Sequence, residues 1–164
     1  CSVVEVMGRH AGNLALYVGL AVGATAVLIP ERPVDFERDV IENIRRARLA
    51  GTTHYMIVVA EGAGKAFYIG EQIHEAIGID PRVTVLGHIQ RGGSPSARDR
   101  ETASRMGYTA VEAMVADKGN RIVVSKDGRI RDLDMEEALA ETKEFQMERY
   151  DILEALTNNG ISRF

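Results

Sequence analysis

Residues 3–29 read VVEVMGRHAGNLALYVGLAVGATAVLI and contain two short apolar runs with a longer patterned stretch between them. The runs at residues 3–7 and 26–29 are nearly continuous and rich in β-branched side chains, which is typical of parallel strands buried on both faces. Between them, Leu14, Ala15 and Val18 recur at helical spacing. The stretch therefore predicts a strand, a helix and a second strand, which is the repeating unit of an α/β fold.

The same alternation continues toward the C-terminus. Apolar runs at residues 55–60 and 83–86 predict two more strands, and amphipathic patterns at residues 36–47 and 67–77 predict the helices beside them. A further helix is expected from about Ser96 to residue 114, with Ser96 as N-cap and Asp99 three residues later. We therefore expect an α/β fold with a parallel sheet flanked by helices, in three layers.

The part of the chain after residue 121 carries different signals. Lys126-Asp127-Gly128-Arg129 is typical of a hairpin turn between residues 122–124 and Ile130. Asp134 with Glu137 predicts the start of a short helix, and residues 148–156 have a helical pattern.

Composition limits the class of protein. The chain has 164 residues, of which 45% are hydrophobic and 27% charged, so we expect a folded chain with one domain over residues 1–164. A net charge of −4 makes a nucleic-acid partner unfavourable. No apolar run approaches the ~20 residues that a membrane span needs.

The one cysteine, Cys1, has no partner for a disulfide and no metal-ligand spacing around it, so a reducing, cytoplasmic location is expected. The chain opens inside an apolar run without an initiator methionine. We therefore expect a fragment of a longer protein.

Polar residues follow three of the predicted strands, in the segments 7–12, 61–64 and 87–94. Because the carboxyl ends of parallel strands meet at one edge of a sheet, ligands of such folds bind there. We therefore expect these three segments to lie together and to form a binding site.

Each segment has a functional and a structural interpretation. Gly8 and Gly12 allow a tight turn before the next helix. The N-terminus of that helix, with Arg9 beside it, would favour an anion; in the alternative interpretation, Arg9 is only a surface residue. We expect a structural role for His10. Glu61, at a strand end, would accept hydrogen bonds from hydroxyl or cationic partners, or it is the N-cap of the next segment.

The stretch from Arg82 to Arg105 is a basic island in an acidic chain. His88 and Arg91 lie in a glycine-containing loop, where charged side chains contribute little to packing. We therefore expect these two side chains to bind a phosphate. Arg98, Arg100 and Arg105 are expected to lie on a solvated helix face. No histidine pair with zinc spacing and no nucleophile elbow occurs, so no metal site is expected in this chain.

Together these segments resemble the phosphofructokinase family over nearly the whole chain, more weakly after about Lys126. Two shorter stretches match in the right order, Met7-Gly8-Arg9-His10-Ala11-Gly12 and Val59-Ala60-Glu61-Gly62. The family signature has three parts, which are matched here by Arg82, Gly87-His88-Ile89-Gln90-Arg91-Gly92-Gly93 and Asp99-Arg100. Four residues separate the first two parts, and five residues separate the last two.

The resemblance implies the sugar-phosphate-binding half of a two-domain kinase that transfers the terminal phosphoryl of ATP to the 1-hydroxyl of fructose 6-phosphate. Glu61 would bind sugar hydroxyls, and Arg9 would also lie near the transferred phosphoryl. Arg82 would come from a neighbouring subunit of a homo-oligomer, most plausibly a homotetramer. The implied substrate-binding residues are Met7, Gly8, Arg9, Glu61, Arg82, His88, Ile89, Gln90 and Arg91.

The chain lacks the family's Gly-Gly-Asp nucleotide loop and its Thr-Ile-Asp-Asn-Asp motif, which carries the catalytic aspartate and a magnesium ligand. ATP and Mg²⁺ would therefore be bound by the full-length enzyme through its N-terminal nucleotide-binding half. The isolated chain is expected to bind no cofactor and to be inactive.

The resemblance also predicts an altered response to nucleotide effectors. Thr25 stands where many bacterial members have a glutamate that meets the effector's magnesium, and Ala50 and Thr52 stand where they have basic residues. We therefore expect a weak or different response to ADP and phosphoenolpyruvate. The sequence leaves three alternatives open: a pyrophosphate-dependent phosphofructokinase, a non-catalytic phosphosugar-binding module, and a purely structural interface domain.

Overall fold

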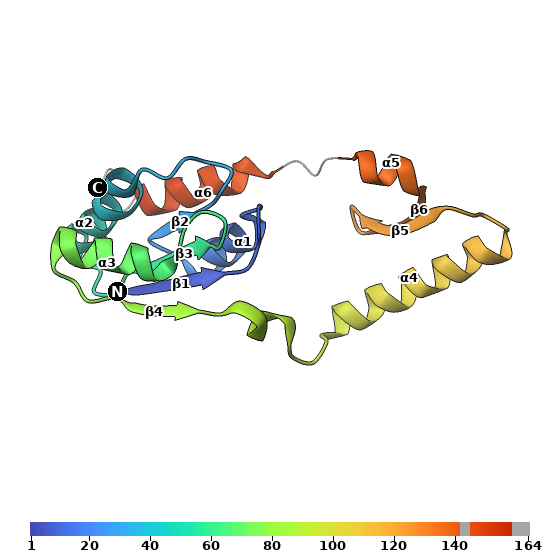
Figure 1. The fold of residues 1–164 in the computed structure, drawn as a ribbon, viewed down its shortest axis with the longest axis horizontal. Helices are drawn as coiled ribbons and strands as arrows, with labels where there is room; N and C mark the ends of the chain where they lie inside the picture. The colour runs from blue at the N-terminus through green and yellow to red at the C-terminus, as the bar shows by residue number, and fades with distance from the viewer. Residues whose placement is uncertain (142–144, 159–164) are drawn as a thin grey trace. The chain divides into compact units, whose positions relative to one another are not determined.

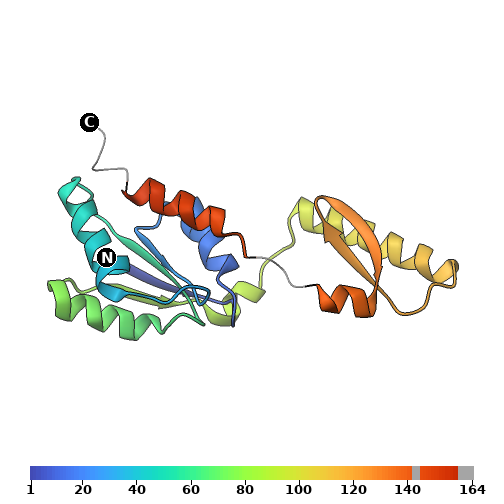
Figure 2. The ribbon, with the colours of Figure 1, turned by 90° about the horizontal axis from the view of Figure 1, so that it is seen from above.

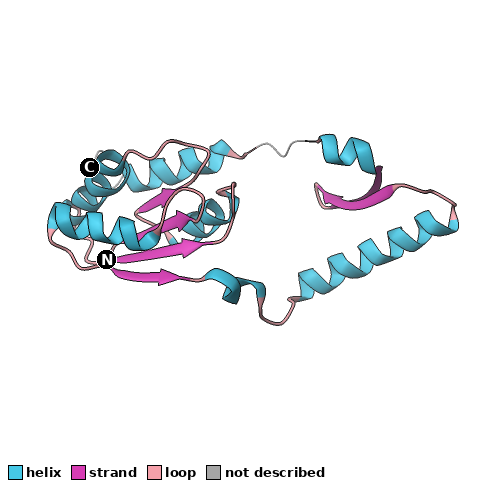
Figure 3. Cartoon of the chain, viewed as in Figure 1, coloured by secondary structure: helices cyan, strands magenta, loops and turns pink. Residues whose placement is uncertain are grey.

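The computed structural model describes residues 1–141 and 145–158 of the chain. Contacts divide the chain into two compact units, and Figures 1 and 3 show the elements of each. Unit 1 comprises Cys1–Arg91 and Phe145–Phe164, and unit 2 comprises Gly92–Glu144. From the sequence we expected one domain over residues 1–164, without a division into two units.

Unit 1 is built on a four-stranded parallel sheet with the order β2-β3-β1-β4. β1 lies between β3 and β4, with Val6 opposite Ala60 in the register. The parallel sheet confirms the predicted α/β class. The strands are β1 (Ser2–Val6), β2 (Ala26–Leu28), β3 (Met56–Ala60) and β4 (Arg82–Val85).

Helices cover both faces of this sheet (Figure 2). α1 (Asn13–Val22) and α6 (Met147–Asn158) pack on one face, where Leu16 and Leu153 belong to the same apolar cluster. The other face is covered by α3 (Ala66–Ile77) and by η1 (Glu37–Ile41), which continues into α2 (Glu42–Leu49). The three predicted layers are therefore confirmed.

One strand differs from the sequence prediction. β4 is not buried on both faces, and Val85 is 47% exposed. The cause is its position at the sheet edge, where β1 is its only neighbouring strand in the sheet.

Unit 2 consists of one long helix, a hairpin and a short helix. Asp127 and Gly128 at the hairpin turn both have positive φ, 53° and 73°, which is the geometry that joins two antiparallel strands most tightly. The elements are α4 (Ala97–Val115), β5 (Arg121–Lys126), β6 (Arg129–Asp134) and α5 (Met135–Ala140).

Both predicted helix starts in unit 2 are confirmed. The backbone N–H of Asp99 donates to Ser96 Oγ at 3.2 Å, and the N–H of Ser96 donates to Asp99 Oδ2 at 2.8 Å, which completes a capping box. Asp134 caps α5 by accepting from the N–H groups of Glu136 and Glu137. No helix in the described part of the chain is both long enough and apolar enough to span a membrane.

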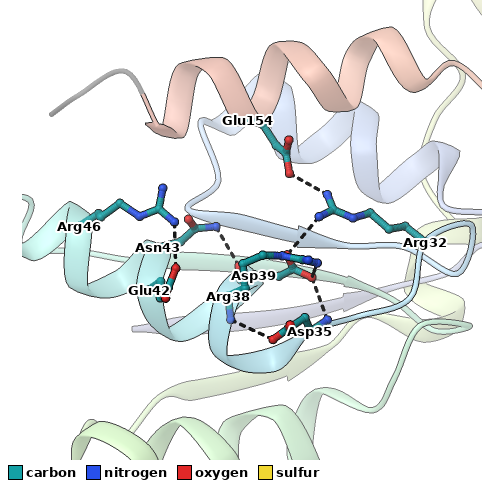
Figure 4. A network of polar contacts seen from close by, with 8 residues as sticks. All are labelled: Arg32, Asp35, Arg38, Asp39, Glu42, Asn43, Arg46 and Glu154. Carbon is teal, nitrogen blue, oxygen red and sulfur yellow. Dashed lines mark hydrogen bonds and ion pairs between the residues drawn. The ribbon is translucent and has the colours of Figure 1, made fainter. Parts of the chain in front are cut away.

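A network of charged residues attaches α6 to the rest of unit 1 (Figure 4). Arg32 donates to Glu154 of α6 at 2.7 Å, and its guanidinium lies 4.9 Å from the ring centre of Tyr150. Burial opposes ionisation of Asp39, but its hydrogen bonds to Arg38 and to the N–H of Asp35 lower its pKa below the usual value. Arg32 therefore joins the C-terminal helix to a buried carboxylate.

We expect Arg32→Ala to lower the free energy of unfolding by about 1.5–3 kcal/mol, because it removes a charge-assisted hydrogen bond and a ring contact. Arg45→Ala is the matched control, since Arg45 pairs with Glu37 on the exposed surface and should cost less than about 1 kcal/mol. Urea unfolding of both variants measures the difference. Equal losses would show that Arg32 does not attach α6.

Candidate functional site

The loop between β1 and α1, residues 7–12, is held by side chains from the other loops at the carboxyl edge of the sheet. The N–H of Met7 donates to Gln90 Oε1 at 2.8 Å. Gln90 belongs to a short 3-10 helix, η2 (Gly87–Arg91), which follows β4. This contact brings together two of the three segments that were predicted to meet.

Glu61 brings in the third segment. Its Oε1 accepts from the N–H groups of Gly8 at 3.0 Å and Arg9 at 2.7 Å. The hydrogen bond from Arg9, followed by that from Gly8, lowers the pKa of Glu61 below its usual value. Among the described residues Oε2 has no protein partner, so this oxygen is available to a ligand.

The alternative interpretation of Glu61 as a helix N-cap is wrong. The next helix, α3, begins at Ala66, and the N–H of Ala66 donates to Glu5 Oε2 at 2.9 Å. Glu5 is a buried carboxylate on β1 that also lies 3.4 Å from Lys65 Nζ. The helix start is thus held by Glu5, and Glu61 serves the β1–α1 loop.

Close backbone approaches explain two of the glycines. A Cβ on Gly62 would lie 2.1 Å from the carbonyl oxygen of Arg9, and a Cβ on Gly8 would lie 2.3 Å from that of Ala11. Arg9 itself has a φ of 52°, in the left-handed region that non-glycine residues rarely adopt. Such backbone strain is characteristic of functional loops that their surroundings hold in place.

A protein carboxylate binds one backbone N–H at the start of α1. The N–H of Gly12 donates to both oxygens of Glu31, at 2.8 and 3.0 Å. Glu31 was not singled out from the sequence, although it follows β2 at the same edge of the sheet. The sequence left an anion site and a surface role for Arg9 equally open at this turn, and the N–H of Gly12 is bound by Glu31 rather than free for a ligand anion.

A cleft of about 640 Å³ opens beside the β1–α1 loop. Glu61 contributes a carboxylate to it, and Arg9 and Arg91 contribute two guanidinium groups. His10, for which the sequence favoured a structural role, also lines the cleft. Its lining residues are Met7, Gly8, Arg9, His10, Glu61, Gly62 and Arg91.

Four predicted site residues do not line this cleft, namely Arg82, His88, Ile89 and Gln90. His88 and Ile89 are exposed on η2, three and two residues before Arg91, and Gln90 lies on the same element, where it accepts from the N–H of Met7. Arg82 begins β4 and pairs with Ser2, so it lies at the amino edge of the sheet, away from the cleft. The chain therefore places five of the nine predicted residues at the cleft and Arg82 at the opposite edge of the sheet.

The remaining arginines of the basic island lie on α4 in unit 2. Arg105 pairs with Glu101 at 3.2 Å on the exposed surface, which agrees with the structural role expected for it. In the described ranges, no group of three histidine, cysteine or acidic side chains is placed to hold a metal ion.

A second cavity, of about 340 Å³, lies at the amino edge of the same sheet. Thr25, Ala50 and Thr52 all line it, together with the basic residues Arg46 and His54. The structure thus brings together the three positions at which the sequence departs from the expected effector-binding pattern.

Fold and site define an α/β protein with a charged cleft at the carboxyl edge of its parallel sheet. Residues 1–114 match the model of the family described as Phosphofructokinase. The ATP-dependent 6-phosphofructokinases of Bacillus thuringiensis (strain Al Hakam) and Bacillus cereus (strain AH187) are each 52% identical to the chain over 155 residues. The chain belongs to the phosphofructokinase family, as its sequence motifs predicted.

The match covers 94% of this chain and 48% of each relative, so the chain spans about half the length of these relatives. The phosphofructokinase of Saccharomyces cerevisiae has a similar structure, with a TM-score of 0.77 and 30% identity over 95% of this chain and 21% of its own. A pyrophosphate-dependent phosphofructokinase from Marinobacter aquaeolei has a TM-score of 0.75 over 98% of this chain and 47% of its own. At 24% identity it shows the fold alone.

The lowered pKa of Glu61 predicts how Glu61→Gln changes the pH dependence of stability. A carboxylate with a lowered pKa in the folded state stabilises the fold above its ordinary pKa of 4.5, and this contribution is lost as the pH falls through the lowered value. The stability difference between wild type and Glu61→Gln should therefore be constant near neutral pH and shrink below pH 4.5. Urea unfolding from neutral to acidic pH measures it, and a difference independent of pH would contradict the role of the ionised carboxylate.

Proposed function

We propose that the chain is the sugar-phosphate-binding half of an ATP-dependent 6-phosphofructokinase. The full-length enzyme transfers the terminal phosphoryl of ATP to the 1-hydroxyl of fructose 6-phosphate, giving fructose 1,6-bisphosphate and ADP. The observation that carries this proposal is the cleft in which Glu61 faces the same space as Arg9 and Arg91. A carboxylate suits sugar hydroxyls, and guanidinium groups suit phosphate oxygens.

Glu61 has two separate tasks in this proposal. Its Oε1 keeps the N–H groups of Gly8 and Arg9 in place, while Oε2 accepts a hydrogen bond from a sugar hydroxyl. Because the pKa of Glu61 is lowered, the side chain is an ionised acceptor at neutral pH. Met7, Gly8 and Arg9 form the wall against which the sugar lies.

The 6-phosphate is bound by η2. Arg91 already lines the cleft, and His88 lies one helical turn earlier on the same element. Gln90 fixes this element to the β1–α1 loop through its bond to the N–H of Met7. Gln90 therefore also positions the element that carries the two phosphate-binding side chains, and Ile89 stays in the proposed substrate-binding set.

The site is completed by a neighbouring subunit of a homo-oligomer, most plausibly a tetramer. Arg82 lies at the opposite end of β4 from η2, so it serves the phosphate of a neighbouring subunit's site. Arg9, beside the sugar, stabilises the negative charge of the transferred phosphoryl.

ATP and Mg²⁺ are assigned to the rest of the enzyme. Within the residues that the structure describes, no cluster of metal-ligating side chains is placed to hold Mg²⁺, and the half that this chain does not span would bind it together with the nucleotide. The chain alone is therefore inactive in this proposal. A cytoplasmic location belongs to the proposal too, and it rests on the single, unpaired Cys1.

The same proposal includes a weak or different response to ADP and phosphoenolpyruvate. Thr25, Ala50 and Thr52 give their cavity no carboxylate for a magnesium ion and no guanidinium or ammonium group of their own for phosphates.

We expect Arg91→Ala in the full-length enzyme to weaken binding of fructose 6-phosphate by about one to two decades, because one charge-assisted phosphate contact is worth roughly 1.5–3 kcal/mol. The control Arg98→Ala removes an exposed arginine of α4 and should leave the affinity unchanged. Calorimetric titration, with inorganic phosphate as competitor, measures both affinities.

Unchanged affinity in Arg91→Ala would contradict the proposal and favour a structural role for this half. Steady-state assays with ATP and with pyrophosphate then identify the donor. Turnover with pyrophosphate but not ATP would move the protein to the pyrophosphate-dependent class, whereas the names of the relatives at 52% identity favour ATP.

A further inference from the structure

Glu5 is a buried carboxylate inside the parallel sheet, and the proposed function gives it no role. It lies on β1 and is 6% exposed. Its neighbours in the register are Val59 of β3 and Val85 of β4. A carboxylate at such a position costs free energy unless its oxygens have partners, whereas an apolar side chain would fit the strand without that cost. The partners of Glu5 therefore indicate what it does.

Both oxygens of Glu5 contact the far end of the segment 61–66, which follows β3. Oε2 accepts from the N–H of Ala66 at 2.9 Å, and Oε1 lies 3.4 Å from Lys65 Nζ. Lys65 is the N-cap of α3 but gives this helix start no side-chain hydrogen bond. Glu5 therefore takes the place of a local cap from a strand that lies about sixty residues earlier in the chain.

The near end of the same segment is held by the next residue of β1. The N–H of Glu61 donates to the carbonyl oxygen of Val6 at 2.9 Å. Between the two ends, Gly62 and Gly64 give the backbone conformational freedom. Consecutive residues of β1 thus hold a glycine-containing segment at both of its ends, one through its backbone and one through its side chain.

The direction of the Glu61 side chain depends on where this segment lies. Its Oε1 meets the N–H groups of Gly8 and Arg9 at 3.0 and 2.7 Å. The adjacent Gly62 approaches the same loop so closely that a Cβ there would lie 2.1 Å from the carbonyl oxygen of Arg9. Such close packing leaves little tolerance, so a small displacement of the segment moves Glu61 out of its hydrogen bonds.

Glu5 also holds a positive charge near Glu61. The hydrogen bonds from Arg9 and Gly8 are the largest causes of the lowered pKa of Glu61, and the charge of Lys65 adds to them. The ammonium group of Lys65 is kept on this side of its segment by Oε1 of Glu5. The two contacts of Glu5 therefore both serve the carboxylate that lines the cleft.

We propose that Glu5 is a positioning residue of the sugar-phosphate site, which fixes the segment 61–66 and so sets where Glu61 accepts a hydrogen bond from a sugar hydroxyl. This inference rests on the proposed function, in which Glu61 binds the sugar. Glu5 itself does not line the cleft, so it acts on the ligand only through Glu61.

The test compares Glu5→Met with Glu5→Gln in the full-length enzyme. Methionine is of similar length but has no oxygen, whereas glutamine keeps an acceptor for the N–H of Ala66. We expect Glu5→Met to raise the KM for fructose 6-phosphate about tenfold or more, because a small misplacement of a binding group is costly. The KM for ATP should be unchanged, and Glu5→Gln should restore most of the sugar affinity.

Ile44→Ala is the control for a loss of stability alone. Ile44 is fully buried in the apolar cluster under α2, a helix that contributes no residue to the cleft. It should lower the stability and leave the KM for fructose 6-phosphate unchanged. If Glu5→Met likewise lowers only the stability, or if Glu5→Gln and Glu5→Met raise this KM equally, the proposal is overturned.

Amide hydrogen exchange in the ligand-free wild-type enzyme tests the contact even where Glu5→Met does not fold. The first N–H groups of a helix ordinarily lack a partner, and the N–H of Phe67 has no acceptor among the described residues. After correction for intrinsic rates, the amide of Ala66 should exchange at least about tenfold more slowly than that of Phe67. Equal rates would overturn the proposal.

Calorimetric titration of the wild-type enzyme with fructose 6-phosphate separates this inference from the proposed function. A slow Ala66 amide in an enzyme that does not bind the sugar would overturn the proposed function, and with it the role of Glu5 in sugar binding. Sugar binding by the wild-type enzyme with an unchanged KM in Glu5→Met would overturn only the positioning role.

Discussion

The structure depends on backbone N–H groups of the β1–α1 loop that are bound by side chains from neighbouring loops. Gln90, Glu61 and Glu31 accept hydrogen bonds from this loop, and each follows a different strand of the sheet. The loop contains Arg9 in a left-handed conformation that costs energy unless the surroundings hold it. The proposed sugar site therefore exists because three strand ends deliver oxygen acceptors to one edge of the sheet.

The carboxylates of Glu31, Glu5 and Glu61 have different roles. Glu31 satisfies the N–H of Gly12 with both oxygens, and Glu5 satisfies the start of α3 from within the sheet. Glu61, which lines the cleft, uses one oxygen for the loop, and its other oxygen has no protein partner among the described residues. Because the other two are bound to helix starts, the carboxylate that faces the cleft is the one suited to a sugar hydroxyl. Arg9 and Arg91 then provide the positive charge that a phosphate requires.

Much of this arrangement could be predicted from sequence because it depends on local patterns. Strand periodicity, the Ser96–Asp99 capping signal and the polar residues at strand ends each act over a few residues. Glu31 could not be assigned in this way, since its partner Gly12 is nineteen residues away and acidic residues are common in loops. The separate unit 2 was missed for a related reason. The pattern of α4 shows an apolar face but does not show whether it packs on the parallel sheet or on the hairpin.

The central claim is that the β1–α1 loop is already held in its binding geometry before any ligand arrives. Amide hydrogen exchange of Met7, Gly8, Arg9 and Gly12 in the ligand-free enzyme tests this most directly, because each N–H donates to a protein acceptor. The account predicts that all four amides exchange slowly without fructose 6-phosphate and that adding the sugar changes them little. Fast exchange in the free enzyme, with protection only after the sugar is added, would contradict it.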